Sequence, residues 1–179
     1  MLYGAQTRRA LADYQISGWP VPPRLIQAIA QIIRDSTGGS TLADEVIAGK
    51  HAAEFPVDVF QDRDGAATVA NVCEVIGVPV EQVNPREVFA AAIRLSVHRV
   101  LRDELRIEVP VGTFSETSAA LKVVADQLPE RHRQLRRWIA GADVTIQLCD
   151  QDGDLPVLGV LLLESALLLA AAIRGKGEA

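Results

Sequence analysis

Aromatic residues make up only 4% of this sequence of 179 residues, although 49% of its residues are hydrophobic. The apolar content therefore comes from Ala, Leu, Val and Ile, which is typical of closely packed helices. Charged residues account for 23%, so the chain has the balance of a globular protein and not that of a disordered one. The composition predicts a mostly α fold.

Cysteine is also scarce, since the sequence has only Cys73 and Cys149, and these lack the CxxC spacing of zinc ribbons. We expect a reduced, cytoplasmic protein. No P-loop, GxGxxG or HExxH motif occurs, and the acidic turn at 150–154 lacks the distal glutamate of a calcium loop, so no cofactor and no metal are expected.

A basic surface for nucleic acid is not expected, because the net charge is −5. One basic cluster occurs, between Arg131 and Arg137, and we interpret it as a solvated helix face. The N-terminal residues MLYGAQTRRAL lack the apolar core of a signal peptide, so secretion is not expected.

One apolar run, 155–173, approaches the length of a membrane span. Glu164 lies near its middle, with Pro156 and Gly159 near its start, so we interpret it as a buried helix of a bundle and expect no membrane span. Left uncovered, such a helix would promote aggregation. We therefore expect a second copy or a partner protein to cover it.

Apolar periodicity predicts helices over 23–35, 41–48 and 83–107, and another that begins near 113 and is kinked or restarted at Pro129. Its continuation is expected to bury Trp138 and to end at Gly141, whereas residues 1–20 are expected to form an irregular arm. The expected domains are a small N-terminal helical domain over 1–83, a long-helix bundle arm over 84–174 and a tail over 175–179.

The central stretch is 55–75, FPVDVFQDRDGAATVANVCEV. Its arm alternates apolar and polar residues up to Gln61, a turn-forming loop follows at 62–65, and a helical pattern resumes at Ala66. A loop that enters a helix in this way presents backbone N–H groups to an anion.

This stretch resembles the first conserved region of the aspartase/fumarase superfamily, in which FPxxxxQ runs into G-S/A-G-T and N-M-N-x-N-E-V. Gln61, Gly65, Asn71 and Glu74-Val75 match without a gap. Residues 2–17 also resemble the family's YGAQTxRAxENFxIS, and 44–51 resemble its DEVIxGKH. The resemblance implies an N-terminal lyase-like domain and the start of a helical bundle, which the family builds from four subunits.

Several polar positions of the family's site differ in this sequence. Arg63, Asp64 and Ala66 stand where the family has a glycine, a small residue and a substrate-contacting threonine. Asn84-Pro85-Arg86-Glu87 replaces S-S-N-D of the second region, and the third signature, G-S-S-x-M-P-x-K-x-N-P, does not occur. A new carboxylate and a lost hydroxyl would repel or ignore a dicarboxylate. The sequence leaves open whether Asp64, Arg63 and Arg86 form a new site.

The resemblance implies substrate-binding positions retained from the family at Thr7, Arg9, Gly65, Asn71 and Gln147, although Thr7 and Arg9 could equally be structural. Gln147 stands where many members have the histidine of acid–base catalysis. No catalytic residue is predicted, and the lone His51 is expected on the surface or packed in the arm.

Two functions remain open from the sequence. The first is a catalytically dead, lyase-like protein that acts as an oligomeric binding, regulatory or structural subunit. The alternative is a carbon–nitrogen or carbon–oxygen lyase whose active site other subunits complete.

Overall fold

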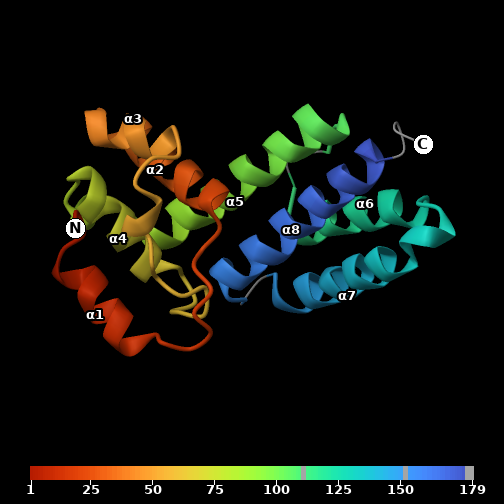
Figure 1. Cartoon of the computed structure of the whole chain (residues 1–179), viewed down its shortest axis with the longest axis horizontal. Coiled ribbons are helices and arrows are strands. Elements are labelled where there is room, and N and C mark those ends of the chain that lie inside the picture. Colours follow the sequence, from red (N-terminus) through yellow and green to blue (C-terminus); the bar gives the residue numbers. More distant parts are fainter. Residues whose placement is uncertain (110–111, 151–152, 176–179) are drawn as a thin grey trace. The chain divides into compact units, whose positions relative to one another are not determined.

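The computed structural model describes residues 1–109, 112–150 and 153–175, and most of these are helical (Figure 1). The mostly α fold predicted from composition and periodicity is therefore confirmed. The α-helices, in chain order, are α1 (Ala5–Asp13), α2 (Pro23–Thr37), α3 (Thr41–Ile47), α4 (Ala66–Ile76), α5 (Pro85–Arg99), α6 (Phe114–Asp126), α7 (Arg133–Cys149) and α8 (Leu155–Arg174).

Two compact units make up the chain. Unit 1 contains Met1–Leu95 and Asp154–Gly159, and unit 2 contains Ser96–Gly153 and Val160–Ala179. The domain boundaries expected from the sequence stay a prediction, and the expected tail lies outside the described residues except for Gly175.

The core of unit 1 forms where α2 packs on α3 and α4, and where α1 packs on α4. Helix α2 begins with Pro23 at its first turn, where the missing N–H costs nothing, and buries one apolar stripe. Helix α4 is short and apolar on nearly all sides, so most of it is buried. The apolar side chains larger than alanine with no exposed surface in this core are Leu25, Ile29, Ile33, Val69, Val72, Cys73, Phe89 and Ile93.

Two helices begin at side-chain caps. At α3, Ser40 Oγ accepts a hydrogen bond from Ala43 N–H at 3.1 Å and donates one to the Ile76 carbonyl at 3.0 Å, which joins α3 to the end of α4. At α6, Thr113 and Glu116 form a reciprocal capping box.

Three expectations are corrected in the helical layout. Residues 1–20 contain α1 and are not wholly irregular. Helix α7 continues through Gly141 to Cys149, so this glycine does not end it. Trp138 is 41% exposed, because it lies at the edge of the buried face of α7, whose centre is formed by Ile139, Ala142 and Ile146.

The helix predicted over 83–107 has two parts. Helix α5 runs as an α-helix to Arg99 and then widens into the π-helix η3 (Val100–Leu105). Arg106 ends it in the left-handed conformation, with φ of 54°.

Helix α8 is long and apolar enough to cross a membrane, and it is the one such helix in the described part of the chain, with a mean hydropathy of 2.2 in its most apolar window. However, 56% of that window is buried inside the fold, as in the core helix of a bundle. Length and composition are weak evidence for a span, so the prediction of a buried bundle helix stands.

Candidate functional site

The N-terminus of α4 is capped by a carboxylate from the loop before it. Asp62 Oδ1 accepts hydrogen bonds from the N–H groups of Asp64 at 3.2 Å and Ala66 at 2.8 Å, and Oδ2 accepts one from Ala67 at 3.0 Å. N–H groups at a helix start carry the positive end of the helix dipole and attract anions. The sequence predicted an anion at this position, and the chain supplies its own.

Gln61 ties this loop to α4. Its amide nitrogen donates to the Asp58 carbonyl and to Thr68 Oγ1, both at 2.7 Å, and its amide oxygen accepts from Thr68 N–H at 2.9 Å. Thr68 is fully buried. The glutamine shared with the family therefore connects the arm to α4 through hydrogen bonds.

The replaced polar positions Asp64 and Arg86 contact each other. Arg86 Nη1 lies 2.5 Å from Asp64 Oδ1, and both side chains are about half exposed, at 46% and 53%. An exposed pair of this kind contributes little to stability, typically less than about 1 kcal/mol. Arg63, the third replaced position, forms a separate contact through its backbone. Its carbonyl accepts a hydrogen bond from Leu155 N–H at 2.9 Å.

Glu74, the glutamate of the family's Glu-Val pair, caps α1. Its carboxylate accepts from the N–H groups of Gly4 at 2.8 Å, Gln6 at 2.9 Å and Thr7 at 3.1 Å, and from the Thr7 hydroxyl at 2.6 Å. Burial opposes the charge of Glu74, but these hydrogen bonds outweigh it and lower its pKa below the usual value. Thr7 is fully buried, and its hydroxyl donates to this carboxylate.

A cavity of about 430 Å³ lies between α1 and α4, beside the Asp62 cap. Alanines from both helices form its apolar lining, and Arg9 of α1 is the one cation among the described residues that line it. Asp13 and Asp62 supply two carboxylates, so the charge of the lining is negative. The lining residues are Gln6, Arg9, Ala10, Asp13, Tyr14, Asp62, Ala66, Ala67 and Ala70.

The other predicted site residues lie apart from this cavity. Gly65 has φ of 72°, and a Cβ atom there would lie 2.3 Å from the Phe89 ring. Asn71 is fully buried and donates to the Glu54 carbonyl at 2.9 Å, while its Oδ1 has no hydrogen-bond partner among the described residues. Of the five predicted residues, Arg9 alone is among those that line the cavity.

Gln147 belongs to unit 2, where it joins a polar cluster between α6 and α7. Its amide nitrogen donates to both carboxylate oxygens of Asp143 at 3.0 Å, and Ser118 Oγ donates to the same carboxylate at 2.6 Å. Asp143 and Ser118 are both buried. Gln147 thus provides hydrogen bonds to a buried carboxylate. The substrate-binding role predicted for Thr7, Arg9, Gly65, Asn71 and Gln147 stays a prediction.

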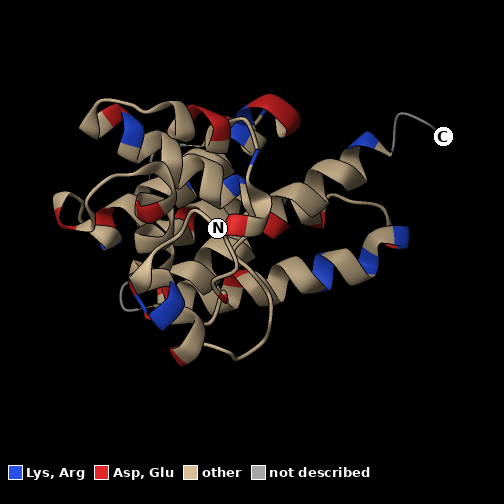
Figure 2. Cartoon of the chain, turned by 60° about the vertical axis from the view of Figure 1, so that its left-hand side comes forward, with Lys and Arg blue, Asp and Glu red and all other residues tan. Residues whose placement is uncertain are grey.

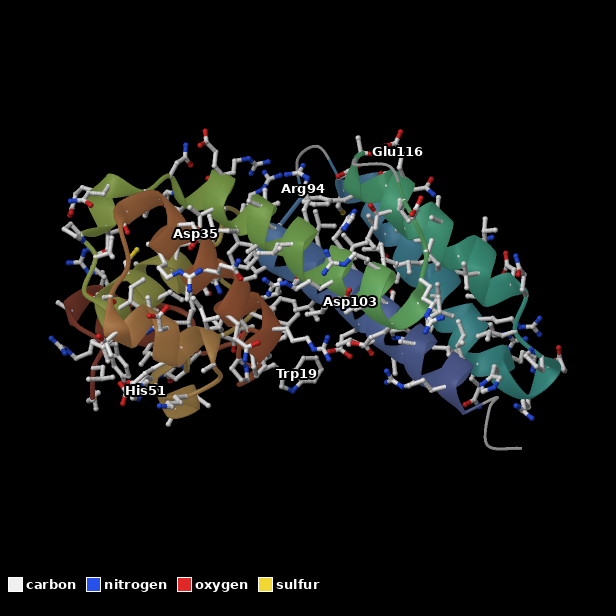
Figure 3. The ribbon with its side chains drawn as sticks, turned by 90° about the horizontal axis from the view of Figure 1, so that it is seen from above. Trp19, Asp35, His51, Arg94, Asp103 and Glu116 are labelled. Atoms are coloured by element: carbon white, nitrogen blue, oxygen red, sulfur yellow. The ribbon has the colours of Figure 1, made fainter. Side chains whose placement is uncertain are left out.

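His51, expected on the surface or in the arm, is labelled in Figure 3 and is partly exposed. Its Nε2 lies 2.7 Å from Oε2 of Glu45. This hydrogen bond is the largest contribution to the lowered pKa of Glu45. In the described part of the chain, no group of three or more His, Cys, Asp or Glu side chains is arranged to hold a metal ion.

Asp58 fixes the arm that leads to the site. Its carboxylate accepts from Ser17 N–H and Gly18 N–H at 2.7 Å, from Ser17 Oγ at 2.8 Å and from Phe60 N–H at 2.9 Å. Burial alone would raise the pKa of Asp58, but these hydrogen bonds lower it to about 2.

We expect Asp58 to make stability depend on pH in the acid range. Its pKa is lower in the folded chain than the ordinary value of 3.8, so its stabilisation is complete above about pH 4 and is lost as the pH falls toward 2. Asp58→Asn should lower the free energy of unfolding at pH 7 by roughly 2 kcal/mol and flatten this acid limb. Urea unfolding at several pH values measures both effects, with the exposed Asp13→Asn as control. An unchanged acid limb in Asp58→Asn would contradict the assignment.

Sequence reasoning missed the capping roles of Asp58, Asp62 and Glu74. A signal existed for Asp62, because an acidic residue just before a helix start is a capping signal. None existed for Glu74, which lies 67 to 70 residues from its partners in α1.

Known proteins similar to this chain are class II fumarate hydratases. The enzyme of Nitrosomonas europaea is 31% identical over 157 residues, covering 66% of this chain and 34% of the relative. Those of Chromobacterium violaceum and Ralstonia nicotianae are 38% and 39% identical over 90 residues, covering 42% of this chain and 20% of each relative. No protein-family model matches the chain.

The chain spans between a fifth and about a third of the length of these relatives. Their similarity agrees with the arm, loop and α4 motif that the sequence shares with the family. These relatives therefore support the relationship to the aspartase/fumarase superfamily that the motifs indicated.

Proposed function

We propose that this protein is a non-catalytic member of the superfamily and acts as an oligomeric binding, regulatory or structural subunit. The observation that carries the proposal is the cap of α4, where Asp62 holds the N–H groups of Ala66 and Ala67 at 2.8 and 3.0 Å. A dicarboxylate at this helix start would have to displace a carboxylate that is covalently part of the chain.

The charges around the cap support the same proposal. Asp13 and Asp62 outnumber Arg9 in the cavity, so a doubly negative ligand would be repelled more than attracted. Ala66 has no hydroxyl to donate, and Asp64 adds a further carboxylate, paired with Arg86, on the same loop. These differences lie inside the region that matches the family.

The second candidate is a carbon–nitrogen or carbon–oxygen lyase. Its active site would be completed by residues from other subunits. One observation favours it: Arg9 is exposed and lines a cavity large enough for a small carboxylate. A guanidinium is well suited to hold a carboxylate through two hydrogen bonds.

Calorimetric titration of the protein with fumarate and with aspartate, each at millimolar concentration, distinguishes the two. We expect no saturable heat, and no loss of fumarate absorbance during prolonged incubation. A saturable signal that Arg9→Ala abolishes would contradict the proposal and favour the lyase.

A matched pair of variants tests the role of the cap itself. Asp62→Ala frees the N–H groups at the start of α4, so it should give weak anion binding that the parent lacks, seen as a rise in Tm with added sulfate. Asp64→Ala removes a carboxylate from the same loop but leaves the N–H groups of Ala66 and Ala67 capped, so sulfate should not change its Tm beyond the parent's response. Equal responses would show that the cap does not exclude anions.

A further inference from the structure

One face of α1 presents polar side chains to the cavity between α1 and α4. Gln6, Arg9 and Asp13 are three and four positions apart, so they lie on one side of the helix together with Ala10. Among the described residues, the side chains of Gln6, Arg9 and Asp13 form no hydrogen bond and no ion pair. All three are exposed, so they are available to a ligand in the cavity.

Arg9 and Asp13 have the spacing of a helix ion pair but are not paired with each other. Opposite charges four positions apart on a helix lie about 5–6 Å apart at Cβ and commonly attract each other. In the part of the chain that the structure describes, neither side chain has an ionic partner. The wall formed by α1 therefore offers one guanidinium and one carboxylate, on neighbouring turns of the helix.

The carboxylate of Asp62, on the α4 side of the cavity, is already used. It accepts hydrogen bonds from the N–H groups of Asp64, Ala66 and Ala67, which is three of the roughly four that a carboxylate can accept. The positive end of the α4 dipole offsets part of its charge. Arg9 and Asp13 are therefore the charged groups of the lining that remain for recognising a ligand.

The rest of the cavity is mainly apolar. Ala10 of α1 and Ala66, Ala67 and Ala70 of α4 line it, and the ring of Tyr14 adds an aromatic surface. At about 430 Å³ the cavity has the size of a small-molecule site. A ligand with a short aliphatic part would cover the alanine methyl groups and remove apolar surface from water.

We propose that this cavity binds a free α-amino acid with an aliphatic side chain, such as leucine, in its zwitterionic form. The ligand carboxylate accepts hydrogen bonds from the Arg9 guanidinium, and the ligand ammonium group donates to the Asp13 carboxylate. The aliphatic side chain packs on the alanines of α4. An α-amino acid suits the wall because one carbon atom carries both of its charged groups, so a single ligand reaches two adjacent turns of α1.

Charge distinguishes this ligand from a dicarboxylate. In the view of Figure 2, acidic and basic residues are interspersed over much of the ribbon, so the lining of the cavity decides which small ligand is attracted. Aspartate would bring a second carboxylate toward Asp13 and Asp62, where like charges repel. An aliphatic amino acid carries no such group.

The inference rests on the proposed binding role, but not on the loss of lyase activity. Calorimetric titration with leucine at millimolar concentration should give saturable heat. Two analogues of the same size test the charged contacts: 4-methylpentanoate lacks the ammonium group, and 3-methylbutylamine lacks the carboxylate. Each loses one charge-assisted contact, so we expect its dissociation constant to be about tenfold higher than that of leucine.

Variants of α1 assign the two contacts. Arg9→Gln and Asp13→Asn should each raise the Kd of leucine about tenfold and leave the helical circular dichroism intact, because both side chains are exposed. Asp13→Asn should also abolish the preference for leucine over 4-methylpentanoate. Arg8→Gln is the matched control, since Arg8 is exposed on the same helix but does not line the cavity, and it should leave the Kd unchanged.

The results separate this inference from the proposed function. No saturable heat with leucine, binding that neither Arg9→Gln nor Asp13→Asn weakens, or equal affinity for leucine and 4-methylpentanoate would overturn the amino-acid site and leave the non-catalytic assignment standing. Fumarate turnover by a protein that binds leucine through Arg9 and Asp13 would overturn the non-catalytic assignment and leave the amino-acid site standing.

Discussion

Replacing Gly65 by alanine is expected to lower the free energy of unfolding by roughly 2–4 kcal/mol. Gly65 has φ of 72°, a conformation that costs alanine about 1 kcal/mol. The new Cβ would also lie 2.3 Å from Cδ2 of Phe89, whose side chain is fully buried and cannot move aside freely. Forcing such a ring out of its place adds about 1–3 kcal/mol. Urea unfolding followed by circular dichroism measures the total.

Gly77→Ala is the matched control for this prediction. Gly77 ends the same helix with φ of 76°, but a Cβ there would meet nothing within 4 Å, so it should show the backbone cost alone. Phe89→Leu, combined with Gly65→Ala, should recover part of the loss because leucine leaves more room. If Gly65→Ala and Gly77→Ala are equally destabilising, the Phe89 contact does not restrict position 65.

Replacing Glu74 by alanine is expected to detach α1 from α4. The change removes the acceptor of three backbone N–H groups and of the Thr7 hydroxyl, and hydrogen bonds to a charged group contribute about 1.5–3 kcal/mol each when one partner is removed. Water replaces part of this at the partly exposed start of α1, so we expect a total loss of roughly 3 kcal/mol. Hydrogen exchange should show faster exchange of the Gln6 and Thr7 amides before global unfolding.

Glu81→Ala, at an exposed position just after the same helix, should change neither stability nor exchange in α1. The sign of the pH effect follows from the lowered pKa of Glu74: its stabilisation is present above the ordinary glutamate pKa and is lost as the pH falls below it. Protection of the Gln6 and Thr7 amides in Glu74→Ala equal to that in the parent would refute the cap.

Local signals predicted the helices whose ends are fixed locally. Ser40 caps α3, and Thr113 and Glu116 cap α6, each within three residues of its partner, so both starts depend on local sequence and agree with the periodicity that predicted helices over 41–48 and from near 113. The apolar run over 155–173 is a helix, as predicted, because helix length and hydropathy are local properties.

Prediction failed where a partner lies far away in the sequence. Helix α1 has Gly4 at its N-cap and no local side-chain cap, and its stabilising anion is Glu74. Gly141 was taken as a helix end from composition, but its φ is compatible with a helix and the packing of Ala142 and Ile146 carries α7 through it. Propensity is a weak guide once tertiary packing decides.

The candidate site divides in the same way. The family motif identified the loop at 62–65 and the start of α4 from the sequence alone. The contact of Asp64 with Arg86 joins positions 22 residues apart, and which of two exposed charges will meet cannot be deduced from spacing. The use of Asp62 as an internal anion was deducible in principle, and it is the contact that bears most on function.

The discontinuity of unit 1 affects the order in which the protein can fold during synthesis. Leu155 N–H bonds the Arg63 carbonyl, and Gly159 lies so near Ile93 and Leu25 that a Cβ there would approach them to 2.9 and 3.2 Å. A ribosome adding 5–20 residues per second needs roughly 3–12 s to make the residues between Leu95 and Asp154. During that interval the apolar surface around Ile93 and Leu25 is not yet covered by the segment 154–159. The newly made N-terminal half should therefore bind chaperones that recognise exposed apolar segments.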